Sequence, residues 1–80
     1  MRQTREFLVI TFSETTDAMA AEKLLQEEGI CGRIIPIPRQ LSAGCGLAYK
    51  TEPDQKKKAE SVLKEAGISW HEMEPVRLWV

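Results

Sequence analysis

The chain has 80 residues, of which 42 % are hydrophobic and 29 % are charged, and its formal net charge is −1. This length predicts a single domain over residues 1–80, and the small charge gives no general attraction to nucleic acid or to an anionic membrane. The apolar run at residues 7–12 is shorter than a secretion signal, with roughly 7–15 apolar residues, or a membrane span, with roughly 18. We therefore expect a cytoplasmic protein whose two cysteines are free thiols.

The beginning of the chain predicts a strand followed by a helix. The sequence FLVITF, residues 7–12, is almost wholly apolar and rich in β-branched and aromatic side chains, which is typical of a strand buried on both faces. Residues 13–29 predict a helix with one apolar face. Ser13 or Thr15 can cap the beginning of this helix, and Gly29 can end it.

A second strand is predicted at residues 31–37, with the sequence CGRIIPI. Pro36 and Pro38 have no backbone N–H, which favours an edge strand and its exit. A loop then leads to a third predicted strand at residues 45–50, CGLAYK, which begins with Cys45.

The end of the chain predicts a second helix and a fourth strand. The helix is expected over residues 51–67, where Thr51 and Asp54 can form a capping box. Residues 69–74 predict the fourth strand. We expect residues 75–80, which begin with a proline, to form an apolar tail separate from that strand.

An internal repeat relates the two halves of the chain. The sequence AEKLLQEEGI, residues 21–30, matches AESVLKEAGI, residues 59–68, at six of ten positions, and the same offset of 38 residues also aligns the predicted strands. Two amphipathic helices ending in Gly-Ile can look alike without duplication, but the aligned strands favour a repeated β-α-β unit. Two such units predict an α+β, ferredoxin-like β-α-β-β-α-β sandwich, in which a four-stranded antiparallel sheet of order 4-1-3-2 carries both helices on one face.

Cys45 lies between Gly44 and Gly46, and the residues leave two interpretations open. A cysteine reacts as its thiolate, which nearby positive charge or inward-pointing backbone N–H groups favour. Arg39 could supply the charge, Ser42 a hydroxyl group, and the two glycines a backbone that turns its amides toward the sulfur. In the structural alternative, the glycines serve a turn or bulge and Cys45 is a small apolar side chain.

The other candidate chemistries have less support. Cys31 begins the second predicted strand and is expected to be a small buried residue. Cys31, Cys45 and His71 lack the close spacing of a zinc site, so we expect neither a metal nor a cofactor. His71, the only histidine, is in the predicted fourth strand, which neighbours the first strand rather than the third; this argues against a catalytic Cys45–His71 pair.

Nucleic-acid binding is also disfavoured. RNA-recognition modules of this architecture stack bases on aromatic residues of the third strand, where this chain has only Tyr49. The lysine run at residues 56–58 opens the second predicted helix, where the helix dipole disfavours cations, and is interpreted as a solvated face.

The stretch from residue 9 to residue 50 resembles a family of small bacterial and archaeal proteins labelled putative Se/S carrier protein-like, formerly a domain of unknown function. The resemblance is most specific at AEKLL, at IPIPR and at the glycine-flanked cysteine in SAGCGLA. Beyond this stretch, it extends over nearly the whole chain. It implies a carrier in which Cys45 holds sulfur or selenium as a persulfide or selenosulfide. The implied partners are a donor enzyme, such as a cysteine desulfurase or selenocysteine lyase, and an acceptor protein. Sulfur-relay proteins with Cys-Pro-x-Pro at the head of a helix differ, because here Gly46 follows Cys45.

We therefore expect a carrier rather than a catalyst, with Arg39, Ser42, Gly44 and Gly46 around the Cys45 thiol. The alternative is a small regulatory or protein-interaction module in which Cys45 is structural. A thiol enzyme is a third hypothesis, which the absence of an evident base disfavours.

We also expect a homo-oligomer, most simply a homodimer. Both predicted helices lie on one face of the sheet, so the sequence offers no evident cover for the other face. Leu78 and Trp79 in the predicted tail would be costly to leave in water, which places Trp79 at or near the interface. In the competing hypothesis, the tail folds back over its own sheet and the protein is a monomer.

Overall fold

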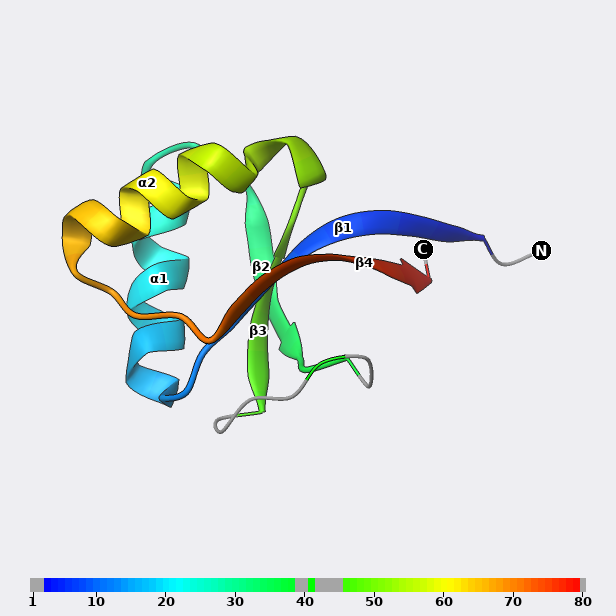
Figure 1. The fold of residues 1–80 in the computed structure, drawn as a ribbon, viewed down its shortest axis with the longest axis horizontal. Coiled ribbons are helices and arrows are strands. Elements are labelled where there is room, and N and C mark those ends of the chain that lie inside the picture. The colour runs from blue at the N-terminus through cyan, green and yellow to red at the C-terminus, as the bar shows by residue number, and fades with distance from the viewer. Residues whose placement is uncertain (1–2, 39–40, 42–45, 80) are drawn as a thin grey trace.

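The computed structural model describes residues 3–38, 41 and 46–79. The elements in chain order are β1 (Thr4–Thr11), α1 (Thr15–Glu27), β2 (Gly32–Pro36), β3 (Leu47–Thr51), a 3-10 turn (Pro53–Gln55), α2 (Lys56–Ala66) and β4 (Glu72–Trp79). The strands form one antiparallel sheet in the order β2-β3-β1-β4, which is the predicted order counted from the opposite edge (Figure 1). The α+β class, the four-stranded antiparallel sheet and the two helices are thus confirmed.

One face of the sheet packs against both helices and forms the main core. Side chains alternate along a strand, so Leu8 and Ile10 of β1 share this face with Tyr49, the cross-strand partner of Ile10 on β3. The helices contribute short or branched apolar residues at helical spacing, namely Ala18, Ala21 and Leu25 from α1 and Ala59 and Leu63 from α2. Both helices therefore lie on the same side of the sheet (Figure 1).

The opposite face, here called the second face, has a smaller apolar cluster. Val9 and Ala48 are fully buried there, and Val76 is 7 % exposed. Leu41, from the connection between β2 and β3, packs against this cluster, as do Ile35 and Leu78. The expectation that this face has no cover within the chain is therefore wrong: the connection is long enough to place an apolar side chain back on the sheet.

Strand β4 is longer than predicted and includes most of the expected tail. It pairs with β1 along its whole length, from Glu72 opposite Thr11 to Trp79 opposite Thr4. Pro75 lies inside the strand, which is tolerated because β4 is an edge strand and a proline there need not break a central ladder. The prediction of a separate tail at residues 75–80 is wrong for residues 75–79, and Val80 lies outside the described residues.

The beginning of α1 differs from the predicted cap. Glu14 occupies the N-cap position with an extended backbone, and no side-chain capping hydrogen bond is formed there. The prediction that Ser13 or Thr15 caps the helix is therefore wrong. Gly29, with a φ of 81°, follows the helix and ends it as expected.

Helix α2 also begins later than predicted. Thr51 is the last residue of β3, and its hydroxyl donates a hydrogen bond of 2.6 Å to the carbonyl oxygen of Cys31. It is therefore committed to the sheet rather than to a capping box with Asp54, and Gln55 occupies the N-cap position of α2. Gly67 adopts the left-handed conformation at the C-cap, as the sequence predicted.

The observed element order is β-α-β-β-α-β, in agreement with the internal repeat. An offset of 38 residues places Thr15–Glu27 of α1 on the segment formed by the 3-10 turn and α2. Within the sheet, the repeat puts the first strand of each half in the centre and the second strand of each half at an edge.

Candidate functional site

Most of the predicted carrier site falls in the connection between β2 and β3, outside the described residues. Cys45, Arg39, Ser42 and Gly44 lie outside the described residues. Gly46 and Leu41 are described, and they establish how the connection between β2 and β3 is attached to the sheet.

The connection is closed at its base and held on the second face. The backbone N–H of Ile37 donates a hydrogen bond of 3.0 Å to the carbonyl oxygen of Gly46, directly beyond the Pro36–Leu47 cross-strand pair. The N–H of Leu41 donates to the carbonyl oxygen of Pro38 at 3.1 Å, and the Leu41 side chain packs on the second-face cluster. Among the described residues, the connection is thus closed at its base by a backbone hydrogen bond and contacts the sheet through the Leu41 side chain.

Gly46 has a φ of 72°, in the left-handed region that non-glycine residues rarely adopt. Among the described residues, no heavy atom lies within 4 Å of a Cβ atom added at this position. The glycine is therefore required by the backbone conformation and not by crowding. This agrees with the sequence interpretation that Gly46 serves a turn leading into the third strand.

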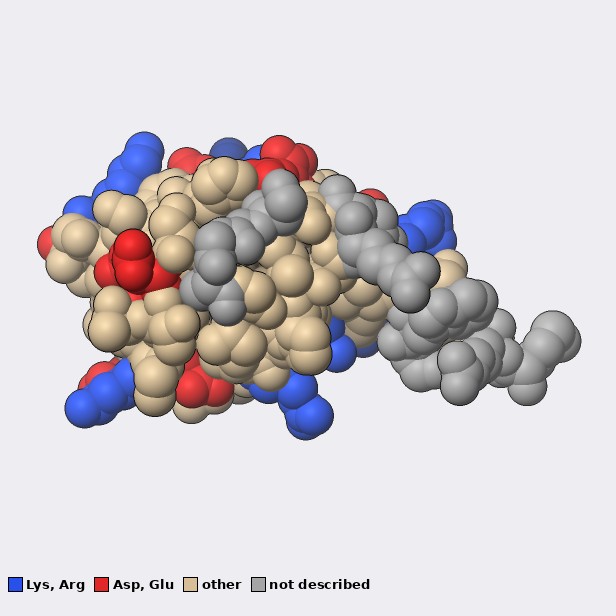
Figure 2. Space-filling view, turned by 90° about the horizontal axis from the view of Figure 1, so that it is seen from below, with Lys and Arg blue, Asp and Glu red and all other residues tan. Residues whose placement is uncertain are grey.

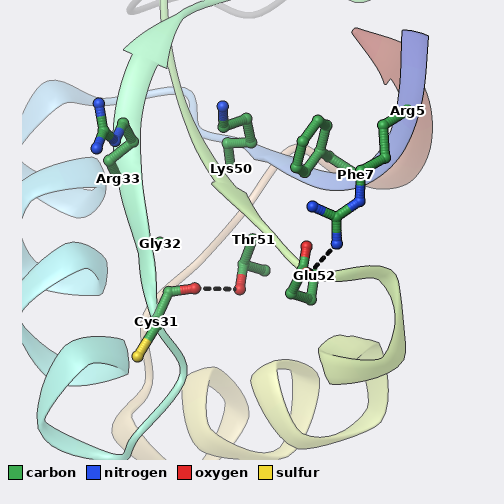
Figure 3. A pocket seen from close by; sticks show the side chains of 8 residues that line it. All are labelled: Arg5, Phe7, Cys31, Gly32, Arg33, Lys50, Thr51 and Glu52. Carbon is green, nitrogen blue, oxygen red and sulfur yellow. Dashed lines mark hydrogen bonds and ion pairs between the residues drawn. The ribbon is translucent and has the colours of Figure 1, made fainter. Parts of the chain in front are cut away.

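A shallow pocket of about 420 Å³ lies at the other end of β2, and the sequence analysis did not identify it (Figure 3). Its lining comes from β1, from the beginning of β2 and from the end of β3, and consists of Arg5, Phe7, Cys31, Gly32, Arg33, Lys50, Thr51 and Glu52. The sequence contains no signal for this pocket, because Arg33 and Lys50 become neighbours only when β2 and β3 pair.

Three cations and one carboxylate line this pocket. Arg5 and Glu52 form an ion pair, while the Phe7 ring has Arg5 Cζ 5.0 Å and Lys50 Nζ 4.6 Å from its centroid. Arg33 is the direct cross-strand partner of Lys50. The pocket therefore carries a local excess of positive charge on a chain whose net charge is −1.

Cys31 lies at the edge of the pocket and is an exposed free cysteine. The prediction that it is a buried filler is wrong, because it precedes β2 at the edge of the sheet, where no further strand covers it. Its carbonyl oxygen accepts a hydrogen bond from the Thr51 hydroxyl, and its sulfur points away from the cationic side chains in Figure 3. The structure thus places an accessible thiol beside the pocket but does not direct it into the cationic group.

Tyr49 is a structural residue of the main core. Its hydroxyl donates a hydrogen bond of 2.7 Å to the carbonyl oxygen of Ile30, and burial raises the pKa of Tyr49 to about 12. A Cβ atom at Gly32 would lie 2.8 Å from Tyr49 Cε2 and 2.2 Å from the Lys50 carbonyl oxygen. The ring therefore packs where only a glycine leaves room. Because Tyr49 is fully buried under the helices, it cannot serve as a surface on which a base stacks.

Charge is distributed without a broad basic surface on the face shown in Figure 2. Its centre is mostly uncharged, and side chains of both signs lie around its margin. The lysine run at residues 56–58 begins α2 and is exposed, as predicted.

His71 precedes β4 at the same end of the sheet as Gly46. The backbone N–H of His71 donates a hydrogen bond of 2.7 Å to the Thr11 carbonyl oxygen. The ring nitrogen Nδ1 lies 3.4 Å from Oε1 of Glu72. A Cys45–His71 pair involves a residue outside the described part of the chain. Within residues 3–38, 41 and 46–79, no three histidine, cysteine or carboxylate side chains are arranged to hold a metal ion.

Comparison with known proteins identifies a family. A family model described as "Putative Se/S carrier protein-like" matches residues 7–74, a range that includes both cysteines. No curated protein and no solved structure matches the chain. In the part of the chain that the structure describes, neither helix has the length and apolar character needed to cross a membrane.

Proposed function

The chain belongs to the putative Se/S carrier protein-like family, and we propose that it carries a sulfur or selenium atom on Cys45 as a persulfide or selenosulfide. The observation that supports this proposal is the family match, which spans Cys45 and most of the domain. The atom would come from a donor enzyme and pass to an acceptor protein, without turnover by the carrier itself.

The proposed transfer needs no external oxidant. The Cys45 thiolate attacks the terminal sulfur of a persulfide on the donor, and the donor cysteine leaves as its thiolate with the electron pair of the broken S–S bond. The product is a persulfide on Cys45. Transfer to the acceptor repeats the step in the opposite sense, which leaves Cys45 as a thiolate again.

Positive charge and backbone amides near the thiol would favour both steps. We assign these roles to Arg39 and to the backbone around Gly44 and Gly46, with Ser42 as a further hydrogen-bond donor. Gly46 adopts a left-handed conformation, which supports a turned backbone directly after Cys45.

The ferredoxin-like fold is part of the same proposal. It is supported by the β-α-β-β-α-β element order, by the sheet order and by the single layer of helices. In such a fold, a carrier loop between β2 and β3 extends from the edge of the sheet, where a partner protein can reach it.

Intact-mass measurement tests the carrier function. After incubation with a cysteine desulfurase and cysteine, the wild-type protein is expected to gain an adduct of one sulfur atom, roughly 32 Da, that a reductant removes. Cys45→Ser should abolish the adduct, and Cys31→Ser is the matched control that should retain it. An adduct that disappears only in Cys31→Ser would assign the chemistry to the exposed thiol beside the pocket. No adduct with any donor would favour an interaction module instead.

The interaction module is the second candidate function, and one observation favours it. Gly46 adopts a left-handed turn and Leu41 packs on the second face, so the connection also has a structural role. In this case Cys45 would be a small side chain in a recognition loop. Cys45→Ser would then leave partner binding intact, and the wild-type protein would form no covalent adduct on Cys45.

A further inference from the structure

We propose that the pocket lined by Arg5, Phe7, Arg33 and Lys50 binds a small, doubly charged tetrahedral oxyanion, such as phosphate, with Arg33 and Lys50 as the principal ligands. The pocket lies at the opposite end of β2 from Gly46. Its occupation is therefore separate from sulfur or selenium transfer on Cys45, and either proposal can fail without the other.

Two cationic residues lie opposite each other on β2 and β3. Arg33 and Lys50 are direct cross-strand partners, and such residues have Cβ atoms about 4.5–5.5 Å apart. Like charges in this position destabilise a sheet. Among the described residues, neither side chain forms an ion pair with a carboxylate, because Glu52, the acid in the pocket, is paired with Arg5. The exposed Arg33 side chain points away from Lys50 in Figure 3, and a bound anion would draw the two cationic groups together in two attractive contacts.

One wall of the pocket is aromatic. The Phe7 ring is 7 % exposed and lies beside the Lys50 ammonium, 4.6 Å from its centroid. An aromatic wall limits water on one side of the cation and strengthens its interaction with an anion. The guanidinium of Arg33 can present two parallel N–H groups to two oxygens of one tetrahedral anion.

A compact ion fits this site better than an extended acidic surface does. The pocket has a volume of about 420 Å³, which accommodates a small anion together with several water molecules. Its charge excess is local, and at physiological ionic strength interactions between exposed charges are screened beyond about 8 Å. The chain as a whole, with a net charge of −1, adds no long-range attraction for an acidic protein.

The test is calorimetric titration with inorganic phosphate and with phenyl phosphate, at constant ionic strength maintained with chloride. Wild-type protein is expected to bind at least one of them, and Arg33→Gln/Lys50→Gln is expected to weaken binding at least about tenfold, since two charged hydrogen-bond donors are removed. Tighter binding of phenyl phosphate would identify a phosphate monoester as the natural ligand class. Equal binding of the two would identify the free ion.

The matched control is Lys56→Gln/Lys57→Gln, which removes the same charge from the exposed beginning of α2. This control should bind as the wild type does. It should also unfold at the wild-type temperature without anion, whereas the pocket variant should be as stable as the wild type or more so, because a like-charge pair is removed. Absence of binding to both probes, or equal loss in the two variants, would overturn the proposal. Binding of an acidic peptide alone would also overturn it, in favour of a protein partner.

Discussion

The two faces of the sheet differ in composition and in how they are covered. The face toward the helices holds most of the fully buried branched and aromatic residues, and the buried Tyr49 hydroxyl on this face donates a hydrogen bond to the Ile30 carbonyl oxygen. The second face has a small apolar cluster covered partly by Leu41, and next to it a pocket lined by cations. Stability is therefore concentrated on one side of the sheet, while the charged pocket and the attached connection occupy the other.

This difference shows how a short chain can combine a packed core on one face of its sheet with charged side chains on the other. An 80-residue domain is expected to have a total stability of only about 4–12 kcal/mol. On the second face, Leu41 covers part of the apolar cluster, and charged side chains of β1, β2 and β3 lie on the sheet at the pocket.

Truncation after Glu74 should unfold the domain, because it removes five of the eight cross-strand pairs between β4 and β1. It also removes Val76 and Leu78 from the second-face cluster. Far-UV circular dichroism and urea unfolding should show loss of the cooperative transition. Met19→Ser in the full-length chain, at a side chain that is 62 % exposed, is the control that should remain folded. A truncated chain that still unfolds cooperatively would show that the last residues behave as the separate tail that the sequence suggested.

Sedimentation of the full-length protein tests the homodimer hypothesis in the same experiment. Among the described residues, Met19 is the exposed large hydrophobic side chain, and Leu41 covers part of the cluster on the second face. A dimer at tens of micromolar would support the hypothesis, and a monomer would support the view that the chain covers its own sheet.

Leu25→Ala and Leu41→Ala compare the two faces with the same chemical change. Leu25 is fully buried between α1 and the sheet, so its truncation should cost about 2–5 kcal/mol of unfolding free energy. Leu41 is half-buried on the second face, so its truncation should cost about 1 kcal/mol. Urea unfolding of the two variants measures both values. Equal losses would contradict the conclusion that stability is concentrated on the helix side.

The pH dependence of unfolding tests the buried hydroxyl on the helix side. The pKa of Tyr49 is about 12 in the folded protein against about 10 in the unfolded chain, so the folded state keeps its proton to higher pH. Its contribution, on the order of 2 kcal/mol, is complete below about pH 10 and is lost as the pH rises toward about 12. Tyr49→Phe should remove this pH dependence and cost about 1–3 kcal/mol at neutral pH, because the Ile30 carbonyl oxygen loses its donor.

Comparison of wild type and Tyr49→Phe isolates this effect from the titration of lysines, which is common to both proteins. Tyr49 is the only tyrosine, so the absorbance of tyrosinate also reports its ionisation directly. Ionisation near pH 10 in the folded protein would show that the ring is not enclosed as described.

The fold could be predicted from the sequence because its signals are repeated and local. Apolar runs of strand length, helices ended by Gly29 and Gly67, and one offset relating the two halves together specify the element order. The helix starts could not be predicted from capping residues, because Thr51 uses its hydroxyl on the carbonyl oxygen of Cys31. Similarly, Pro75 suggested a chain break, but an edge strand can include a proline.

The site was less accessible to prediction. The pocket depends on cross-strand register, which a single sequence does not give, and Arg33 and Lys50 are 17 positions apart in the chain. The role of Gly32 was also missed, since the need for a glycine arises from the Tyr49 ring packed against it. Cys45 was identified from its glycine neighbours and from a family resemblance, and its carrier role stays a prediction.

The pairing of Thr4 with Trp79 brings the two ends of the chain together on adjacent strands. Cross-strand partners in an antiparallel sheet have Cα atoms about 4.5–5.5 Å apart, a span that a tight turn can bridge. Joining the ends and opening the chain between β2 and β3 would exchange the order of the two β-α-β halves without altering a strand pair. The beginning of β1 and the end of β4 lie at the same end of the sheet (Figure 1), so a protein fused at either place would be held near Arg5, which lines the cationic pocket.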